Sequence, residues 1–207
     1  MKNNTAIDVF DRWALSNKDK GMEEGHNLSV ERMIQISKNI KSSKLENIKV
    51  LDLGCGNGWM SKKLLKTFDN IDYMGIDGSV NMIKKAKSNY PNEKYLCVDI
   101  NNWIPSNLFN LVISMEVLYY LDNPIKFLEN LYLKGMSDNG LITVGMDHYK
   151  ENISSLSWPN DLDVDMHTFS INQWINIFYE AGFSEVSHEQ FNPNDDWGGT
   201  LIIKAIK

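Results

Sequence analysis

Residues 50–58 read VLDLGCGNG, and this stretch decides the fold of the chain. An apolar strand pattern with Asp52 inside it runs directly into a turn that holds glycines at positions 54, 56 and 58. Glycine adopts positive φ without a steric penalty and lets a ligand come close to the backbone. The stretch therefore predicts a strand, a tight turn and the start of a helix. In open α/β sheets such a turn lies at the carboxyl end of a strand, where ligands bind.

Short apolar segments alternate with helical patterns on both sides of this turn. Near-continuous apolar strands between helices are typical of a parallel sheet that is covered on both faces. Strands are expected at 48–53, 71–76, 95–98, 109–115, 140–146, 183–191 and 200–206, the last two as an antiparallel hairpin at the sheet edge. We therefore predict a Rossmann-like, doubly wound α/β fold with seven strands, mostly parallel with an antiparallel C-terminal hairpin strand.

The helical patterns complete this arrangement. In the core, helices are expected at 59–68, 79–90 and 123–134, the last with Pro124 at its first position. A further helix begins at Ser170, where Ser-Ile-Asn-Gln reads as a capping box, and ends at Gly182. Near the N-terminus a short amphipathic helix around Ala6–Ala14, a polar loop at 17–26 and a helix at 28–40 are expected.

The whole chain is expected to form a single domain in four parts. These are an N-terminal helical cap (1–44), a cofactor-binding core (45–146), a substrate-side loop or lid (147–169), and a C-terminal helix with the edge hairpin (170–207). The third part is polar and too long for a routine connection, and loops of that length are often functional.

The composition excludes several classes of protein. The chain has 207 residues, 43% hydrophobic and 23% charged, and a formal net charge of −6, which argues against nucleic acid or an anionic membrane surface as the main partner. No run approaches the roughly 20 apolar residues of a membrane span. The first five residues lead into an amphipathic stretch and not into an apolar signal core, which favours the cytoplasm.

The two cysteines, Cys55 and Cys97, lie in segments that are expected to be buried, and both are interpreted as reduced core thiols. No Cys/His spacing resembles a zinc site, and no metal is expected.

A dinucleotide-binding fold is the main alternative for the glycine turn. Its fingerprint, G-x-G-x-x-G, requires a third glycine at position 59 for close packing of helix and strand. That position is Trp59, and the glycines stand instead at 54, 56 and 58. The departure disfavours NAD or FAD, while a purely structural strand–turn–helix stays open.

Two acidic residues follow the next two strands. Asp77 ends the second strand, 23 positions after Gly54, where a carboxylate can accept hydrogen bonds from both hydroxyls of a ribose. Taken alone it reads more readily as a helix cap, and its spacing to the glycine turn reverses that interpretation. Asp99 ends the third strand, and its carboxylate can accept from an adenine amino group while the Ile100 backbone N–H donates to the ring.

Together these motifs resemble the class I S-adenosylmethionine-dependent methyltransferases. The resemblance rests on VLDLGCGNG, on GIDGS (75–79) with Met82, on CVDI (97–100) and on FNLVISMEVLYYL (109–121), and it covers roughly residues 45–146 in motif order. It implies S-adenosylmethionine as the cofactor and a methyltransferase activity, and it does not indicate a subfamily.

The resemblance also implies roles for individual positions. The glycine turn would contact the methionine moiety, Asp77 the ribose, Asp99 and Ile100 the adenine, and 114–116 would lie beneath the sulfonium. An N-terminal aromatic, Trp13, and the segment 21–26 would cover the cofactor. The predicted cofactor-binding residues are Trp13, Asp52, Gly54, Cys55, Gly56, Asp77, Gly78, Ser79, Met82, Asp99, Ile100, Ser114, Met115 and Glu116.

Methyl transfer from a sulfonium needs mainly alignment, which can supply up to about 7–11 kcal/mol of barrier reduction. A general base adds about 10²–10⁴-fold where the acceptor is protonated. The candidates for catalytic roles are His148 and Glu116. The candidates for substrate binding are Tyr119, Tyr120, Asp147, His148, Trp158 and His167. For each of them a packing or surface role is the alternative.

The sequence thus predicts methyl transfer to a small-molecule acceptor, without nucleic acid or membrane as a partner. The alternatives are a protein that binds the cofactor without transferring the methyl group, a protein or RNA methyltransferase, and a nicotinamide-linked dehydrogenase.

Overall fold

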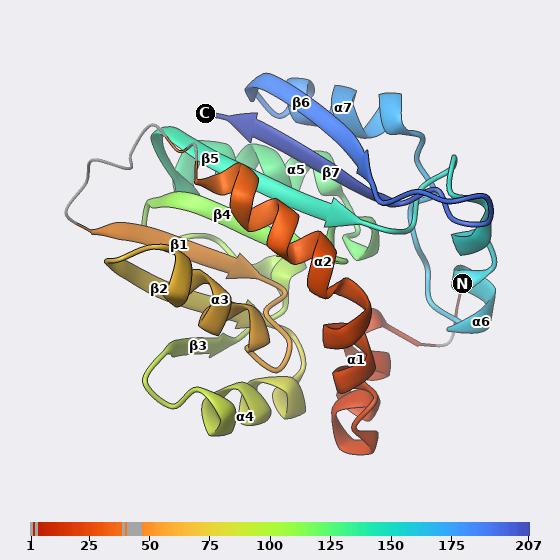
Figure 1. The fold of residues 1–207 in the computed structure, drawn as a ribbon, viewed down its shortest axis with the longest axis horizontal. Coiled ribbons are helices and arrows are strands. Elements are labelled where there is room, and N and C mark those ends of the chain that lie inside the picture. The colour runs from red at the N-terminus through yellow and green to blue at the C-terminus, as the bar shows by residue number, and fades with distance from the viewer. Residues whose placement is uncertain (1, 3, 39, 41–46) are drawn as a thin grey trace.

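The strand that ends in the glycine turn, β1 (Ile48–Leu53), lies inside a seven-stranded sheet. The computed structural model describes residues 2, 4–38, 40 and 47–207. The strand order is β3-β2-β1-β4-β5-β7-β6 (Figure 1). The other strands are β2 (Ile71–Asp77), β3 (Lys94–Cys97), β4 (Phe109–Met115), β5 (Met136–Met146), β6 (Ser184–Phe191) and β7 (Thr200–Ile206).

The order of the strands reverses beside β1. From β1 the chain builds outward through β2 to β3, then returns to place β4 on the other side of β1. These pairs and β4–β5 are parallel, whereas β7 runs antiparallel to both β5 and β6. The predicted fold class is confirmed, and a topological switch point lies between β1 and β4, where such sheets bind ligands.

Helices cover both faces of the sheet. On one face lie α2 (Asp19–Ser37), α3 (Trp59–Thr67) and α4 (Val80–Asn89), and on the other α5 (Pro124–Asn130) and α7 (Ile171–Glu180) (Figure 1). Each face has its own buried apolar cluster. The capping box of α7 is confirmed, since the Ser170 side chain accepts from the Gln173 backbone N–H and Gln173 bonds back to Ser170. One π-helical turn, η3 (Leu131–Gly135), follows α5.

The N-terminal segment differs from the sequence prediction. The first helix, α1 (Ala6–Ser16), is confirmed. The loop predicted at 17–26 is wrong, because α2 already begins at Asp19 and continues through both glycines of that segment. The turn between the helices is confined to Asn17, which takes a left-handed conformation at φ 59°, and Lys18. Packing of α2 on the sheet outweighs the poor helix propensity of glycine.

Gly25 in the interior of α2 gives a direct test of this difference. An added Cβ would meet no heavy atom within 4 Å, and the residue is exposed. Gly25→Ala is therefore expected to raise the free energy of unfolding by about 0.5–1 kcal/mol, because glycine loses more backbone entropy in a helix than alanine. Urea denaturation measures the change, and a loss of stability would show that the segment is not helical in solution.

The segment between β5 and α7 holds two short helices, η4 (Ile153–Ser155) and α6 (Trp158–Asp161). Near its C-terminal end Val164 forms an isolated parallel bridge with Asn4, which joins this segment to the N-terminus. The remaining short helices, η1 (Ile100–Asn102) and η2 (Leu118–Tyr120), follow β3 and β4.

Two smaller findings bear on the sequence predictions. Cys55 is buried, but Cys97 is exposed, because β3 is an edge strand on which only Tyr95 is buried. The prediction of a buried thiol is wrong for Cys97. Among the residues that the structure describes, no helix is both long and apolar enough to cross a membrane.

Candidate functional site

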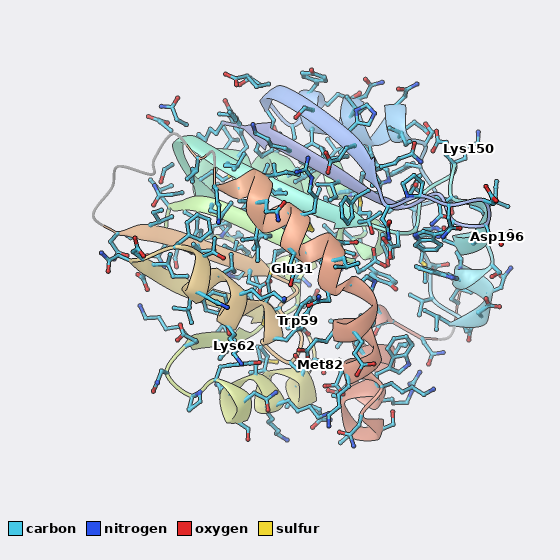
Figure 2. All side chains as sticks on the ribbon, in the orientation of Figure 1. Glu31, Trp59, Lys62, Met82, Lys150 and Asp196 are labelled. Atoms are coloured by element: carbon cyan, nitrogen blue, oxygen red, sulfur yellow. The ribbon has the colours of Figure 1, made fainter. Side chains whose placement is uncertain are left out.

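A cavity of about 470 Å³ opens at the carboxyl ends of the parallel strands, beside the switch point. This volume is in the range of roughly 300–1,000 Å³ that is usual for small-molecule sites. Its walls come from the ends of β1, β2 and β4, from the N-terminal helices, and from the segment before α7. In Figure 2 the side chains of Trp59 and Met82, which both line the cavity, lie between the N-terminal helices and the α3–α4 side of the sheet.

The glycine turn forms one wall of this cavity. Gly54, Gly56 and Gly58 have φ of 75°, 53° and 82°, the left-handed region that favours glycine. The Gly54 and Cys55 N–H groups donate to the Ile76 carbonyl at 2.8 and 3.0 Å, so the turn is fixed to the end of β2. Gly54, Cys55 and Gly56 all line the cavity, as the sequence predicts.

The carboxylate of Asp77 joins the glycine turn to the start of α4. Its Oδ2 accepts from the Gly56 N–H at 2.9 Å, and its Oδ1 accepts from the Ser79 N–H at 2.8 Å. Burial raises the pKa of Asp77, against the opposing effect of these two hydrogen bonds. Each oxygen retains a further lone pair, and Asp77 and Gly78 line the cavity. The group is thus positioned to accept two hydroxyl hydrogen bonds.

Asp99 and Ile100 line the next part of the cavity wall. The Asp99 carboxylate caps η1, accepting from the Asn101 N–H at 3.0 Å and from the Asn102 side-chain amide at 2.7 Å. Its role as a cap coexists with its place at the cavity, because a carboxylate has about four acceptor positions.

Asp52 lies at the floor of the cavity and is completely buried. Its Oδ2 accepts from the Tyr73 hydroxyl at 2.8 Å, whereas its Oδ1 has no hydrogen-bond partner in the described structure. Burial raises the pKa of Asp52 to about 7. An unsatisfied buried oxygen at a cavity wall is a place where a ligand donor would be stabilising.

Beside the glycine turn, Asp19 completes the acidic floor and was missed by the sequence reasoning. Its carboxylate accepts from the Asn57 side-chain amide at 2.9 Å and forms an ion pair with Lys85 at 2.7 Å. Asp19 and Asn57 both line the cavity. A continuous N-terminal helix is needed to bring Asp19 there, and the predicted loop hid that geometry.

At the end of β4, Glu116 lines the cavity with a buried carboxyl group and a φ of 62°. Such a backbone is uncommon for a residue with a side chain and occurs often at functional sites. The Tyr119 hydroxyl donates to its Oε2 at 2.6 Å, and the Asp147 N–H donates to its Oε1 at 2.5 Å. Burial, together with the nearby Asp147 charge, raises the pKa of Glu116 to about 8.

His26 of α2 joins this group. Its Nδ1 donates to the Met22 carbonyl at 2.8 Å, and its Nε2 lies 3.2 Å from Oδ2 of Asp147. Burial lowers the pKa of His26, but the hydrogen bond to Asp147 and the charges of Glu116 and Asp147 outweigh it and raise the pKa to about 9. One side-chain nitrogen or oxygen atom from each of His26, Glu116 and Asp147 lies within 4.8 Å of the other two. The hydrogen bonds among these residues account for this short spacing.

These pKa shifts predict how stability depends on pH. His26 has an ordinary pKa of 6.5 and a folded pKa of about 9, so its stabilising contribution is complete below pH 6.5 and is lost as the pH rises through 9. Glu116 acts in the same direction, because the folded protein keeps a proton that the unfolded chain releases. The urea midpoint is expected to fall between pH 6.5 and 9, less steeply in His26→Gln. Equal slopes would exclude an ionised His26–Asp147 pair.

Several predicted site residues lie away from the cavity. His148 is fully buried, with its Nδ1 at 3.0 Å from the Ser155 carbonyl and its Nε2 at 2.9 Å from the Thr168 hydroxyl. Both ring nitrogens are therefore engaged in hydrogen bonds within the protein, and His148 does not line the cavity. The prediction of His148 as a catalytic base does not fit this position. The Trp158 ring stacks on the His148 ring, with their centroids 6.2 Å apart. His167 lies 2.9 Å from the Leu121 carbonyl through its Nε2.

The remaining predicted site residues contact residues of the cavity wall or hold its strands and helices together. Ser114 donates to the Leu53 carbonyl at 2.8 Å, between β4 and β1. Ser79 caps α4 and donates to Asp11 at 2.7 Å. Trp13 packs edge-on against Phe10 at 5.3 Å, and it is Phe10 that lines the cavity. Tyr119 reaches the site through Glu116, and Asp147 through Glu116 and His26, whereas Tyr120 lines the cavity directly.

A glycine turn at a switch point, followed by acids at the ends of β2 and β3, defines a nucleotide-type ligand site in a Rossmann-like domain. Residues 44–182 match the family model of the methyltransferase domain. The chain therefore belongs to this methyltransferase family.

Relatives and solved structures agree with this assignment. Trans-aconitate 2-methyltransferase of Rhizobium etli is 24% identical over 159 residues, which are 77% of this chain and 58% of that protein. The chain thus spans little more than half of that relative. A putative methyltransferase from Haloferax volcanii, in complex with the activator Trm112, has a TM-score of 0.81 and 25% identity over 95% of this chain and 96% of its own. The N-methyltransferase NodS of Bradyrhizobium japonicum, in complex with S-adenosyl-L-homocysteine, has a TM-score of 0.72 and 19% identity, and the alignment covers 99% of each chain.

Proposed function

We propose that the chain is an S-adenosylmethionine-dependent methyltransferase that acts on a small molecule. The observation that carries the proposal is one continuous cavity, lined by the glycine turn, Asp77, Asp99 and Glu116. These are the motif positions at which the resemblance puts the methionine moiety, the ribose, the adenine and the sulfonium. Solved neighbours of the same fold bind S-adenosylmethionine or its demethylated product, which supports the choice of cofactor.

The residues present fit this cofactor. Asp77 has free lone pairs for two ribose hydroxyls, and the unpartnered Oδ1 of Asp52 is available to a donor from the methionine end. At Gly56 the backbone is open to a ligand, since an added Cβ would have only the Met82 sulfur within 4 Å. The acidic floor of Asp19 and Asp52 suits the ammonium and sulfonium charges of the donor.

The chemistry requires little from the side chains beyond position and the exclusion of water. When bound, the cofactor supplies an electrophilic methyl group on a positively charged sulfur. Met115 and Glu116 at the end of β4 form the wall that faces the reacting atoms, and α1 and α2 cover the cavity from the N-terminal side. Holding the acceptor in line can account for up to about 7–11 kcal/mol of the barrier.

Two of the four parts expected from the sequence, the N-terminal cap (1–44) and the substrate-side segment (147–169), contribute residues to the cavity. The N-terminal cap contributes His26 and Phe10 to the cavity lining, and the substrate-side segment contributes Val164 and Asp165. We propose that both segments close over the bound acceptor, and that Tyr120 forms part of its binding surface.

Calorimetric titration with S-adenosylmethionine and S-adenosylhomocysteine tests the binding step, with NAD⁺ as the comparison. We expect micromolar affinity for the first two and no binding of NAD⁺. The absence of heat at millimolar S-adenosylhomocysteine would refute the proposal. A coupled homocysteine assay with a panel of acceptors then tests transfer, and binding without any turnover would favour a protein that retains the cofactor site alone.

A further inference from the structure

The charges around the cavity are unevenly distributed. Among the described residues that line it, seven are acidic and two can carry a positive charge, Lys2 and His26. The acidic residues are Asp19, Asp52, Asp77, Asp99, Glu116, Asp122 and Asp165. The first four are assigned above to the cofactor alone. Glu116, at the end of β4, faces the reacting atoms of both cofactor and acceptor, and Asp122 and Asp165 line the cavity outside the cofactor motifs.

Both cations already have protein partners. The Lys2 ammonium donates to the Asn160 side-chain carbonyl at 2.6 Å, in a solvent-exposed hydrogen bond. His26 has both ring nitrogens engaged, one by Met22 and one by Asp147. The only arginines of the chain, Arg12 and Arg32, bond to other residues and do not line the cavity. An acceptor carboxylate or phosphate would therefore lose hydration among seven acidic groups, with no arginine among the described lining residues and only these two engaged cations to offset the cost.

A cationic nitrogen finds the opposite environment. The rings of Phe10 and Tyr120 both line the cavity, with centroids 5.5 Å apart and planes at 82°. Aromatic faces attract ammonium groups within about 6 Å of the ring centroid. Glu116 also lines the cavity, and its two oxygens accept one hydrogen bond each from the protein, which leaves further lone pairs for a ligand. Its carboxyl group carries a negative charge above its pKa of about 8.

Resting on the function proposed above, we propose that the methyl acceptor is an amine, bound between Glu116 and the rings of Phe10 and Tyr120. The amine arrives as an ammonium ion and releases one proton to solvent. Its nitrogen lone pair then forms the N–C bond as the C–S bond breaks, and the C–S electron pair stays on sulfur as a neutral thioether. The product leaves as an N-methylammonium ion, so charge and atoms balance.

The first test compares three probes of matched size: benzylamine, benzyl alcohol and benzoate, with trans-aconitate as a polyanionic probe. Binding of S-adenosylhomocysteine is established first, so failure of the cofactor site is seen separately. Homocysteine release at pH 8.5 is then measured for each probe. We expect kcat/KM for the amine to exceed that of both anions by at least about tenfold. Faster methylation of an anion, or no turnover of the amine by cofactor-binding protein, would overturn the proposal.

A second test asks whether Glu116 recognises the charge. In Glu116→Gln the ratio of kcat/KM for benzylamine over benzyl alcohol is expected to fall about tenfold, with both rates measured at saturating S-adenosylmethionine so that a change in cofactor affinity does not enter the ratio. A merely structural role would lower both rates together and leave the ratio unchanged, which would contradict the assignment. Glu129→Gln, at an exposed glutamate of α5 outside the cavity, is the matched control and is expected to keep both rates.

Discussion

Asp77→Ala is expected to weaken S-adenosylmethionine binding about 100-fold or more. Hydrogen bonds to a charged group contribute about 1.5–3 kcal/mol each, and the carboxylate is positioned to accept two from the ribose. About 1.4 kcal/mol corresponds to a factor of ten in affinity. The carboxylate also holds the Gly56 N–H at 2.9 Å, so its removal loosens the glycine turn as well. Calorimetric titration of wild type and variant measures the change.

The control for this variant lies on the same strand. Asp72 stands near the start of β2, forms an ion pair with Lys94 at 2.6 Å and does not line the cavity. Asp72→Ala removes the same functional group from the opposite end of β2, and its cofactor affinity is expected to equal that of wild type. If Asp77→Ala, shown by circular dichroism to be folded, binds the cofactor as tightly as Asp72→Ala, the ribose lies elsewhere.

Gly54→Ala is expected to lower the free energy of unfolding by about 2–5 kcal/mol. The residue has a φ of 75°, and an added Cβ would overlap with Cγ2 of Val117. The left-handed backbone costs about 1–2 kcal/mol for a residue with a side chain, and overpacking adds about 1–3 kcal/mol. Since whole domains are stable by only about 5–15 kcal/mol, the effect is large. Urea denaturation measures it.

Gly56→Ala separates the two causes. Its φ of 53° carries the same backbone penalty, but its Cβ would have only the Met82 sulfur within 4 Å. The loss of stability is therefore expected to be smaller than in Gly54→Ala by at least about 1 kcal/mol. Equal losses in the two variants would mean that the contact between Gly54 and Val117 does not constrain the turn.

The sheet could be predicted closely from the sequence, because its strands are continuous apolar runs ended by turn residues. Strands β1, β4 and β7 begin and end at the predicted residues. Strand β5 is longer than predicted, beginning at Met136, because its first part pairs with β4 through a register shift beside Phe109. After the buried Met136, residues 137–140 read SDNG, which is polar and typical of a turn, so the pattern did not reveal this part of the strand.

The N-terminal helices could be predicted only in part. Gly21 and Gly25 suggested a loop, but α2 is stabilised by the burial of Val30, Met33 and Ile34 against the sheet. That contribution depends on a partner surface far away in the sequence, which local propensity does not describe. The misplaced loop also hid Asp19 as a cavity residue, whereas His26 belongs to the segment 21–26, which is expected to cover the cofactor.

Within the site, the sequence predicted the residues that directly follow a strand. It did not predict the residues that tertiary packing brings to the cavity. Gly54, Asp77 and Asp99 follow strands directly, so their position at the sheet edge is fixed by the fold. The end of β5 shows the limit of this reasoning. Position alone did not tell that His148 turns towards Ser155 and Thr168, while Asp147 turns towards His26.

The central claim is that S-adenosylmethionine binds in the cavity between the glycine turn and Glu116. A crystal structure with S-adenosylhomocysteine bound tests it most directly. The account predicts ribose hydroxyls within hydrogen-bonding distance of Asp77, the adenine beside Asp99 and Ile100, and the sulfur facing Glu116. A ligand bound elsewhere, or one whose ribose does not contact Asp77, would contradict it.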